Sequence, residues 1–251
     1  MDADKLHLSA PKGIEIKGVK DSHDNQTKEQ SAGGNVGVFV GFNGNSYGIG
    51  LEAGVNVGRG NSNSSSNTYQ NSVINVNKLE TFSEEGALVL DAAVINAGRW
   101  EGVLKDVVFN SRQDTTRYKS EQMQAGASGS IAYGSGGGAS VSMGYNNAKM
   151  NMAQVNEQTG VHVGKEGMDV TVLNHTQNNG GILTSDAPKS ANRFSTGTYG
   201  ESHIKNHSEL KTRNISVSGG TGGFNPMGTL MSLPGNRNER EQSTTYATVG
   251  G

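Results

Sequence analysis

Histidine is the residue type in this chain that could bind a metal, and two of the six histidines have a suitable spacing. His203 and His207 are four positions apart, which is the separation of zinc ligands that share one face of a helix. No Glu follows His203, and the neighbouring residues are typical of a strand or loop rather than a helix. We therefore expect exposed polar histidines here and no metal site.

The sequence also gives no support for acid–base or nucleophilic catalysis. Asp21 and Asp114 occur at corresponding places of an internal repeat, but they lie a whole repeat apart, and aspartate is favoured in turns and as a backbone cap. The serine in the run 126–129 lacks the Gly-x-Ser-x-Gly spacing of a nucleophile elbow. The glycine-rich runs 134–138 and 219–223 lack the Lys-[Ser/Thr] ending of a phosphate-binding loop. The sequence predicts no catalytic residue, no cofactor site and no enzyme.

Aromatic residues gather in two glycine-rich stretches and are the candidates for a contact surface. Packing between neighbouring strands of a hairpin is the common role of such residues. The alternative is an amphipathic hairpin that meets a bilayer or a membrane protein, where Tyr and Phe suit the interface. The candidate contact residues are Phe39, Phe42, Tyr47, Tyr133 and Tyr145.

Composition narrows the class of protein that could position these residues. Gly is 37 of 251 residues, apolar residues reach only 32%, and the formal net charge is −2. No Lys/Arg excess exists to neutralise phosphates, so we expect no nucleic-acid partner. Cysteine is absent, which excludes disulfides and thiolate metal sites. The first residues carry no basic and apolar signal-peptide pattern, and both ends of the sequence are strand-like, so we expect a fragment of a longer protein.

Short alternating runs such as 36–40, 107–109 and 170–172 are separated by Gly, Asn and Ser, which is typical of strands. An offset of 93 residues aligns Asp21 with Asp114, Ala32 with Ala125 and Val38 with Ile131. A third, degraded copy is expected to begin near Lys205. Stacked short strands with small turn residues need few large apolar side chains, which favours an all-β solenoid with protruding glycine-rich hairpins. The expected parts are coils at 1–32, 73–125 and 154–218, excursions at 33–72 and 126–153, and an irregular tail at 219–251.

Three segments carry a resemblance to a known family. Residues 107–120 resemble the pattern SxQDTxxYxS, and residues 154–172 resemble VxEQSGIxAGxxGxDVxV with mild departures at Thr159, Val161 and Val163. Residues 242–250 are similar to TxATIGxG. These patterns are typical of the haemagglutinin-type repeat regions of two-partner-secretion exoproteins, which include filamentous haemagglutinins and contact-dependent growth-inhibition effectors. The resemblance covers roughly residues 10–251.

The resemblance implies a right-handed parallel β-helix within a long secreted filament at the bacterial cell surface. In that family an outer-membrane two-partner-secretion transporter exports the chain, growth-inhibition members carry a C-terminal toxin, and this region acts at the outer membrane or a surface receptor of the target cell. This sequence contains neither a recognisable secretion domain nor a toxin domain. The leading interpretation is a structural and target-cell interaction segment that supports adhesion or toxin delivery. The alternatives are a membrane-inserting lytic segment that forms a pore, and a degenerate gene cassette without independent function. The lack of cysteine suits a chain exported through an oxidising periplasm.

Overall fold

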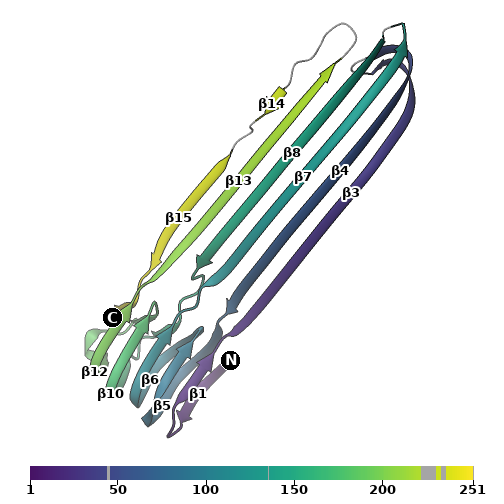
Figure 1. Cartoon of the computed structure of the whole chain (residues 1–251). Helices are drawn as coiled ribbons and strands as arrows, with labels where there is room; N and C mark the ends of the chain where they lie inside the picture. The colour runs from purple at the N-terminus through teal and green to yellow at the C-terminus, as the bar shows by residue number, and fades with distance from the viewer. Residues whose placement is uncertain (44–45, 135, 222–229, 233–235, 251) are drawn as a thin grey trace.

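The computed structural model describes residues 1–43, 46–134, 136–221, 230–232 and 236–250. These residues form two sheets, one with nine strands and one with seven, and the helical structure among them is one short 3₁₀ turn, η1 (Lys189–Ala191). No helix in this part of the chain is long and apolar enough to cross a membrane. Figure 1 shows a compact stack of short strands at one end, from which a long ribbon of strands extends.

The nine-stranded sheet is a stack of parallel coils. Coil 1 contains β1 (Asp2–Ser9) and β2 (Ile14–Lys17), coil 2 is β5 (Ser72–Asp91), and coil 3 is β6 (Ala93–Asn110). Coil 4 contains β9 (Gly160–Val163) and β10 (Met168–Asn179), and coil 5 contains β11 (Ile182–Ser185) and β12 (Asn192–Ser202). β16 (Thr248–Gly250) begins coil 6 by pairing with β11. Each coil pairs in parallel with the next, so the predicted all-β solenoid is confirmed.

The core of the solenoid is a set of side-chain columns that run through the stacked coils. Leu79 lies opposite Trp100, which lies opposite Met168, and all three are buried. The indole Nε1 of Trp100 donates a hydrogen bond to Oγ1 of Thr81 at 3.0 Å, which satisfies its one polar atom in the interior. Because each coil needs only a narrow apolar stripe, a chain with few large apolar residues can build this core.

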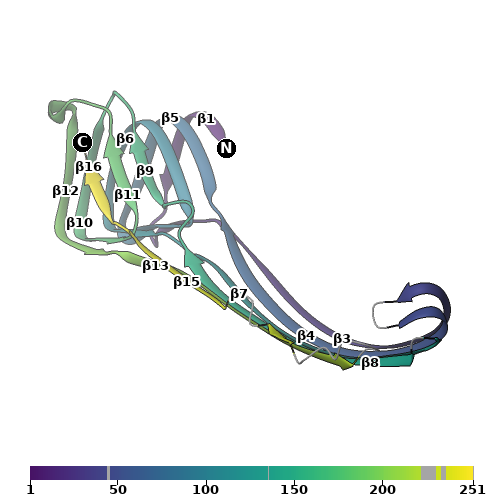
Figure 2. The ribbon, with the colours of Figure 1, turned by 90° about the horizontal axis from the view of Figure 1, so that it is seen from above.

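The seven-stranded sheet consists of three long hairpins that lie side by side. Hairpin 1 pairs β3 (Val19–Asn43) with β4 (Ser46–Gln70), and hairpin 2 pairs β7 (Asp114–Tyr133) with β8 (Gly136–Gln154). Hairpin 3 pairs β13 (Ile204–Thr221) with β15 (Arg237–Thr245) and β14 (Leu230–Ser232). Neighbouring hairpins are joined by β4–β7 and β8–β13 pairing. The hairpins therefore form one continuous antiparallel sheet, which leaves the coil stack and curves at its far end (Figure 2).

The internal repeat has a structural explanation, because hairpins follow coils 1, 3 and 5. One repeat supplies two coils to the solenoid and two strands to the antiparallel sheet. Strands in either kind of sheet are spaced by about 4.8 Å, so both structures lengthen by the same amount for each repeat. This match in pitch lets a hairpin pair with the next one while its root stays attached to its own coil.

The strands of the hairpins extend beyond the parts expected from the sequence. The expected boundaries at 33 and 126 fall within β3 and β7, and the segment 219–251 contains β14, β15 and β16. The halves of the hairpins next to the coils are rich in polar residues without apolar alternation. Hydrogen bonds to neighbouring hairpins keep them extended, and a single-strand hydrophobic pattern does not reveal such bonds.

Candidate interaction surface on the hairpin sheet

The outer half of the hairpin sheet exposes a cluster of apolar side chains on one face. In an antiparallel sheet, directly paired residues point to the same side, and alternate residues along a strand share a face. Val38 pairs with Leu51, and Leu51 pairs with Ile131, so three strands contribute to one surface. We define the apolar face as Val36, Val38, Val40, Ile49, Leu51, Val55, Val57, Met123, Ile131, Tyr133, Val141, Met143 and Ile215. Their exposed fractions range from 41% for Ile215 to 94% for Tyr133.

Apart from Phe39, the opposite face of the same sheet is made of small and polar residues. Ser128 pairs with Ser140, and their hydroxyl groups lie 2.6 Å apart. Asn56 lies between Val55 and Val57 on β4 and therefore points away from the apolar face. The outer half of the sheet is thus amphipathic across its thickness, with one face apolar and the other hydrophilic.

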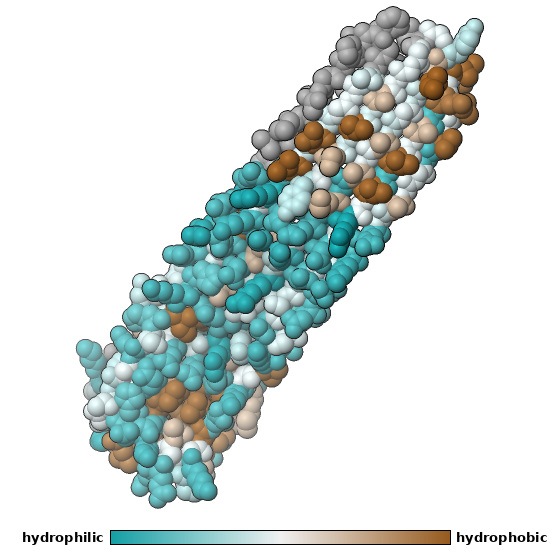
Figure 3. All heavy atoms as spheres, viewed as in Figure 1, coloured by the Kyte–Doolittle hydropathy of each residue, from teal (hydrophilic) through white to brown (hydrophobic). Residues whose placement is uncertain are grey.

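The half of the sheet nearer the coils carries positive charge on the side of the apolar face. The register of the strands places eight Lys and Arg side chains of this region on the same side as the apolar face. We define the basic band as Lys28, Arg59, Arg117, Lys119, Lys149, Lys211, Arg213 and Arg240. All eight of these side chains are exposed. Three carboxylates lie on this side of the same region, and they belong to Asp24, Glu121 and Glu209. Figure 3 shows the apolar cluster near the far end and the hydrophilic region below it.

Glu209 shows how the carboxylates are held within the basic band. Its Oε1 lies 2.8 Å from Nζ of Lys211 and 2.7 Å from Nη2 of Arg240. Hydrogen bonds from Lys211 and then from Arg240 lower the pKa of Glu209 to about 2. Glu209 therefore stays ionised at neutral pH, and the cations still outnumber the carboxylates on this surface.

The five aromatic candidates do not all lie on one face of the sheet. Tyr133 and Tyr145 belong to the side of the apolar face, with Tyr133 almost fully exposed. Phe39 lies on the other face, where its ring covers Gly50 of the neighbouring strand so closely that a Cβ there would come within 2.7 Å. Phe42 and Tyr47 pair through their backbones, but their side chains lie outside the described part of the structure.

Sequence reasoning missed the aliphatic majority of the apolar face and the whole basic band. Val36, Val38 and Val40 alternate visibly, yet alternation alone is equally consistent with a strand packed on a core. The register between hairpins is the missing signal, because it aligns the apolar residues of five strands on the same side. Of the predicted aromatic residues, Tyr133 belongs to the apolar face as defined, and it is a minor part of that surface.

The residues considered for chemistry have structural roles at the roots of the hairpins. Asp114 is buried, and its Oδ1 accepts a hydrogen bond from the backbone N–H of Tyr69 at 2.7 Å. Nδ1 of His203 accepts a hydrogen bond from the backbone N–H of Ala247 at 3.2 Å, and its ring packs edge-on against Tyr246. Among the described residues, no group of three His, Asp or Glu side chains could hold a metal ion.

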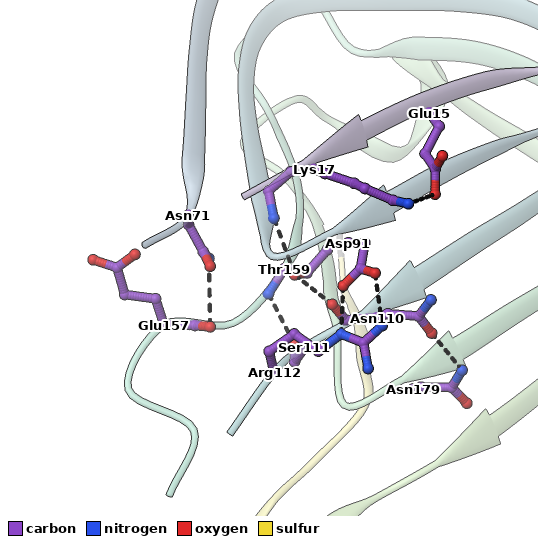
Figure 4. A network of polar contacts seen from close by, with 11 residues as sticks. Glu15, Lys17, Asn71, Asp91, Asn110, Ser111, Arg112, Glu157, Thr159 and Asn179 are labelled. Carbon is purple, nitrogen blue, oxygen red and sulfur yellow. Dashed lines mark hydrogen bonds and ion pairs between the residues drawn. The ribbon is translucent and has the colours of Figure 1, made fainter. Parts of the chain in front are cut away.

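A polar network attaches hairpin 2 to the coils on either side of its root (Figure 4). Arg112 donates hydrogen bonds from Nε and Nη2 to the two carboxylate oxygens of Asp91, at 2.5 and 2.6 Å. Thr159 donates from its backbone N–H to Oγ of Ser111 and from its hydroxyl to the carbonyl of Asn110, both at 2.8 Å. The network fixes where the chain leaves coil 3 and where it returns to coil 4, so it sets the direction of the hairpin.

Comparisons with known proteins agree with this architecture. The Hemagglutinin repeat family matches residues 1–127. The chain is 34% identical to a protein named Toxin CdiA from Escherichia coli, with 86% of this chain and 7% of that protein covered. It is 33% identical to a tRNA nuclease CdiA from Escherichia coli strain NC101, with 97% of this chain and 8% of that protein covered. It is also 29% identical to a deoxyribonuclease CdiA from Dickeya dadantii strain 3937, with 86% and 6% covered. The chain spans less than a tenth of the length of these relatives.

Parallel coils that carry a hairpin after coils 1, 3 and 5 define a β-solenoid repeat protein with a lateral antiparallel sheet. The chain belongs to the Hemagglutinin repeat family, and the resemblance found in its motifs is confirmed. It is a structural segment related to the filamentous exoproteins of that family.

Proposed function

We propose that this segment contacts the lipid surface of a target cell through the apolar face and the basic band, and thereby supports adhesion or toxin delivery by a longer exoprotein. The observation that carries the proposal is the amphipathic outer half of the sheet with positive charge directly beside it. Monomeric soluble proteins rarely expose contiguous apolar patches beyond a few hundred Å², and larger patches mark membrane or protein contacts.

The two parts of the surface suit the two layers of a membrane boundary. Moving aliphatic side chains from water into the acyl region lowers the free energy of the system. Tyrosine side chains such as that of Tyr133 are typical of the headgroup level of a membrane. Each Lys or Arg held near an anionic lipid surface contributes about 1 kcal/mol of attraction. Because the basic band lies on the side of the apolar face, both parts can meet one membrane surface at the same time.

We also propose the wider setting from the relatives. The longer exoprotein would leave its cell through a two-partner-secretion transporter in the outer membrane and act as a secreted or surface-bound protein. Two of the relatives described above are named as nucleases, and we assign no such activity to this segment. The roots of the hairpins use Asp114 and His203 to bind backbone groups, which supports a structural role instead of a catalytic one.

Vesicle flotation tests the proposal. We expect the chain to float with vesicles that contain phosphatidylglycerol more strongly than with phosphatidylcholine vesicles, and we expect added salt to reduce the difference. Leu51→Asp, at the centre of the apolar face, should abolish flotation because it places a charge against the acyl region. Asn56→Asp makes the same charge change on the opposite face of the same strand and should leave flotation intact.

Equal flotation of the Leu51→Asp and Asn56→Asp variants, or none by the unmodified chain, would refute a role for the apolar face in lipid contact. Dye release from the same vesicles separates contact from permeation. Release at low protein concentration would replace the delivery proposal by the lytic alternative.

A further inference from the structure

Three lysines form a row across the middle of the hairpin sheet, on the side of the apolar face. Lys119 of β7 pairs with Lys149 of β8, and Lys149 pairs with Lys211 of β13. Directly paired residues of an antiparallel sheet point to the same side, with Cβ atoms about 4.5–5.5 Å apart. All three side chains are exposed. We call these three residues the lysine row.

The lysine row opposes two general preferences of β-sheets. Like charges directly opposite each other destabilise a sheet, and lysine is depleted in strands. Lysine is often placed on edge strands, where it blocks pairing with another chain. However, β7, β8 and β13 each have a paired strand on both sides of the row. Protection of a sheet edge therefore does not explain the lysine row.

The two outer lysines of the row have counter-ions, and the central lysine has none among the described residues. Nζ of Lys119 lies 3.2 Å from Oε1 of Glu121, and Nζ of Lys211 lies 2.8 Å from Oε1 of Glu209. The neighbours of Lys149 along the same face of β8 are both asparagines, which cannot neutralise its charge. The row therefore presents one ammonium group that is available to an anion.

Two arginines add to the positive charge around Lys149. Arg117 of β7 pairs with the asparagine on one side of Lys149, and Arg213 of β13 pairs with the asparagine on the other side. Such diagonal neighbours lie about 7–8 Å apart, within reach of long side chains. Both arginines are exposed and make no ion pair with a described residue. Lys149 is thus at the centre of a group of five cations and two carboxylates, and both carboxylates already bind the outer lysines.

We propose that the lysine row binds the phosphomonoester headgroup of a membrane lipid. The proposal rests on the function proposed above, because the row belongs to the basic band, and it adds the chemistry of the headgroup. A phosphomonoester carries a charge of about −1.5 to −2 at pH 7 and has three strong acceptor oxygens. It can accept charge-assisted hydrogen bonds from adjacent ammonium groups at the same time, which relieves their repulsion. A phosphodiester has a single charge and fewer free oxygens, so it satisfies fewer donors.

The position of the row favours a lipid over a soluble phosphate. Lys119 lies four residues along β7 from Met123, and Lys211 lies four residues along β13 from Ile215. Met123 and Ile215 both belong to the apolar face, and four residues of a strand span about 13 Å. One lipid surface can therefore meet the row and the apolar face together, whereas a soluble ion would gain nothing from the apolar face.

Vesicle flotation at matched surface charge tests the headgroup. Phosphatidic acid carries a phosphomonoester and phosphatidylglycerol carries a phosphodiester, and the two kinds of vesicle are adjusted to the same zeta potential. We expect the chain to bind the phosphatidic acid vesicles about tenfold more strongly, because one additional charge-assisted hydrogen bond strengthens binding by about this factor.

Two variants with the same net charge separate the row from general attraction to an anionic surface. Lys149→Gln removes the central charge of the row, and Lys28→Gln removes one charge from the basic band on β3. Lys149→Gln should remove the preference for phosphatidic acid, Lys28→Gln should keep it, and Lys149→Arg should retain most of it. Circular dichroism and thermal unfolding verify that each variant is folded. Lys149→Gln should be at least as stable as the unmodified chain, because it relieves the repulsion in the row.

Equal binding of the unmodified chain to both kinds of vesicle, or the same preference in the Lys149→Gln and Lys28→Gln chains, would overturn the proposal. If Leu51→Asp still abolishes flotation with phosphatidylglycerol in that case, the lipid contact proposed above stands and only the headgroup assignment fails. Millimolar inorganic phosphate at constant ionic strength should leave the chain bound to phosphatidic acid vesicles. Complete displacement would assign the row to a soluble phosphate and would also overturn the proposal.

Discussion

Asp114 provides the sharpest test of how the hairpins are joined. Its carboxylate accepts the backbone N–H of Tyr69 at 2.7 Å in a buried position, and it also binds Nδ2 of Asn156. Hydrogen bonds to charged groups contribute about 1.5–3 kcal/mol, and a buried N–H left without a partner adds to the loss. We therefore expect Asp114→Ala to destabilise the junction by about 2 kcal/mol.

Hydrogen exchange measures this effect locally. A loss of about 2 kcal/mol corresponds to roughly 30-fold faster exchange of the Tyr69 amide, since about 1.4 kcal/mol is a factor of ten. Asp21→Ala is the matched control, because it changes the same residue of the repeat at an exposed position and should alter stability by less than about 0.5 kcal/mol. Asp114→Asn should cost less than Asp114→Ala, because an asparagine oxygen can still accept the N–H of Tyr69, as Asn206 accepts the N–H of Val155 in hairpin 3, and only the acceptor for Asn156 is lost.

The result that would refute this reasoning is equal exchange of the Tyr69 amide in the Asp114→Ala and Asp21→Ala chains. Faster unfolding of the whole Asp114→Ala chain without faster exchange of the Tyr69 amide would equally contradict a local anchoring role.

Two further predictions concern the solenoid. Gly160→Ala should prevent close stacking of coils 4 and 5, because the added Cβ would overlap the carbonyl oxygen of Ile182. We expect a loss of about 3 kcal/mol or more in urea unfolding, and an unchanged unfolding midpoint would contradict the prediction. Hydrogen bonds from Lys5 and then from His7 lower the pKa of Glu80 to about 2, so its stabilising contribution is present above about pH 4.5 and is lost as the pH falls towards 2. Glu80→Gln should flatten the stability profile in that window, and a titration midpoint of Glu80 near its ordinary value would disprove the contacts.

Much of the solenoid could be predicted from the sequence, because its signals are local. The alternating runs at 107–109 and 170–172 lie in β6 and β10 as buried strands, and the glycine-rich composition agrees with a thin core. The offset from Asp21 to Asp114 is the length of two coils and one hairpin. Local pattern suffices here because a coil buries the same stripe wherever it stacks.

The candidate surface could be predicted only in part. Tyr133 was identified from its residue type, but Phe39 belongs to the opposite face and Lys149 gave no signal at all. A side chain acquires its face from the register of its strand, and register depends on residues that are distant in sequence. The strand structure of the polar parts of β3 and β15 could not be predicted for the same reason, because pairing with neighbouring strands keeps these parts extended without burying an apolar pattern.

The sequence by itself determined that the chain is all-β, repetitive and free of thiol chemistry, since composition and short-range alternation carry those properties. Only the tertiary structure decided that the three hairpins join into one sheet, that their apolar residues share a face and that cations lie beside them. The physical reason is that hydrogen bonding between hairpins depends on the equal advance of coils and strands, which is a property of the assembled stack. No single repeat contains that information.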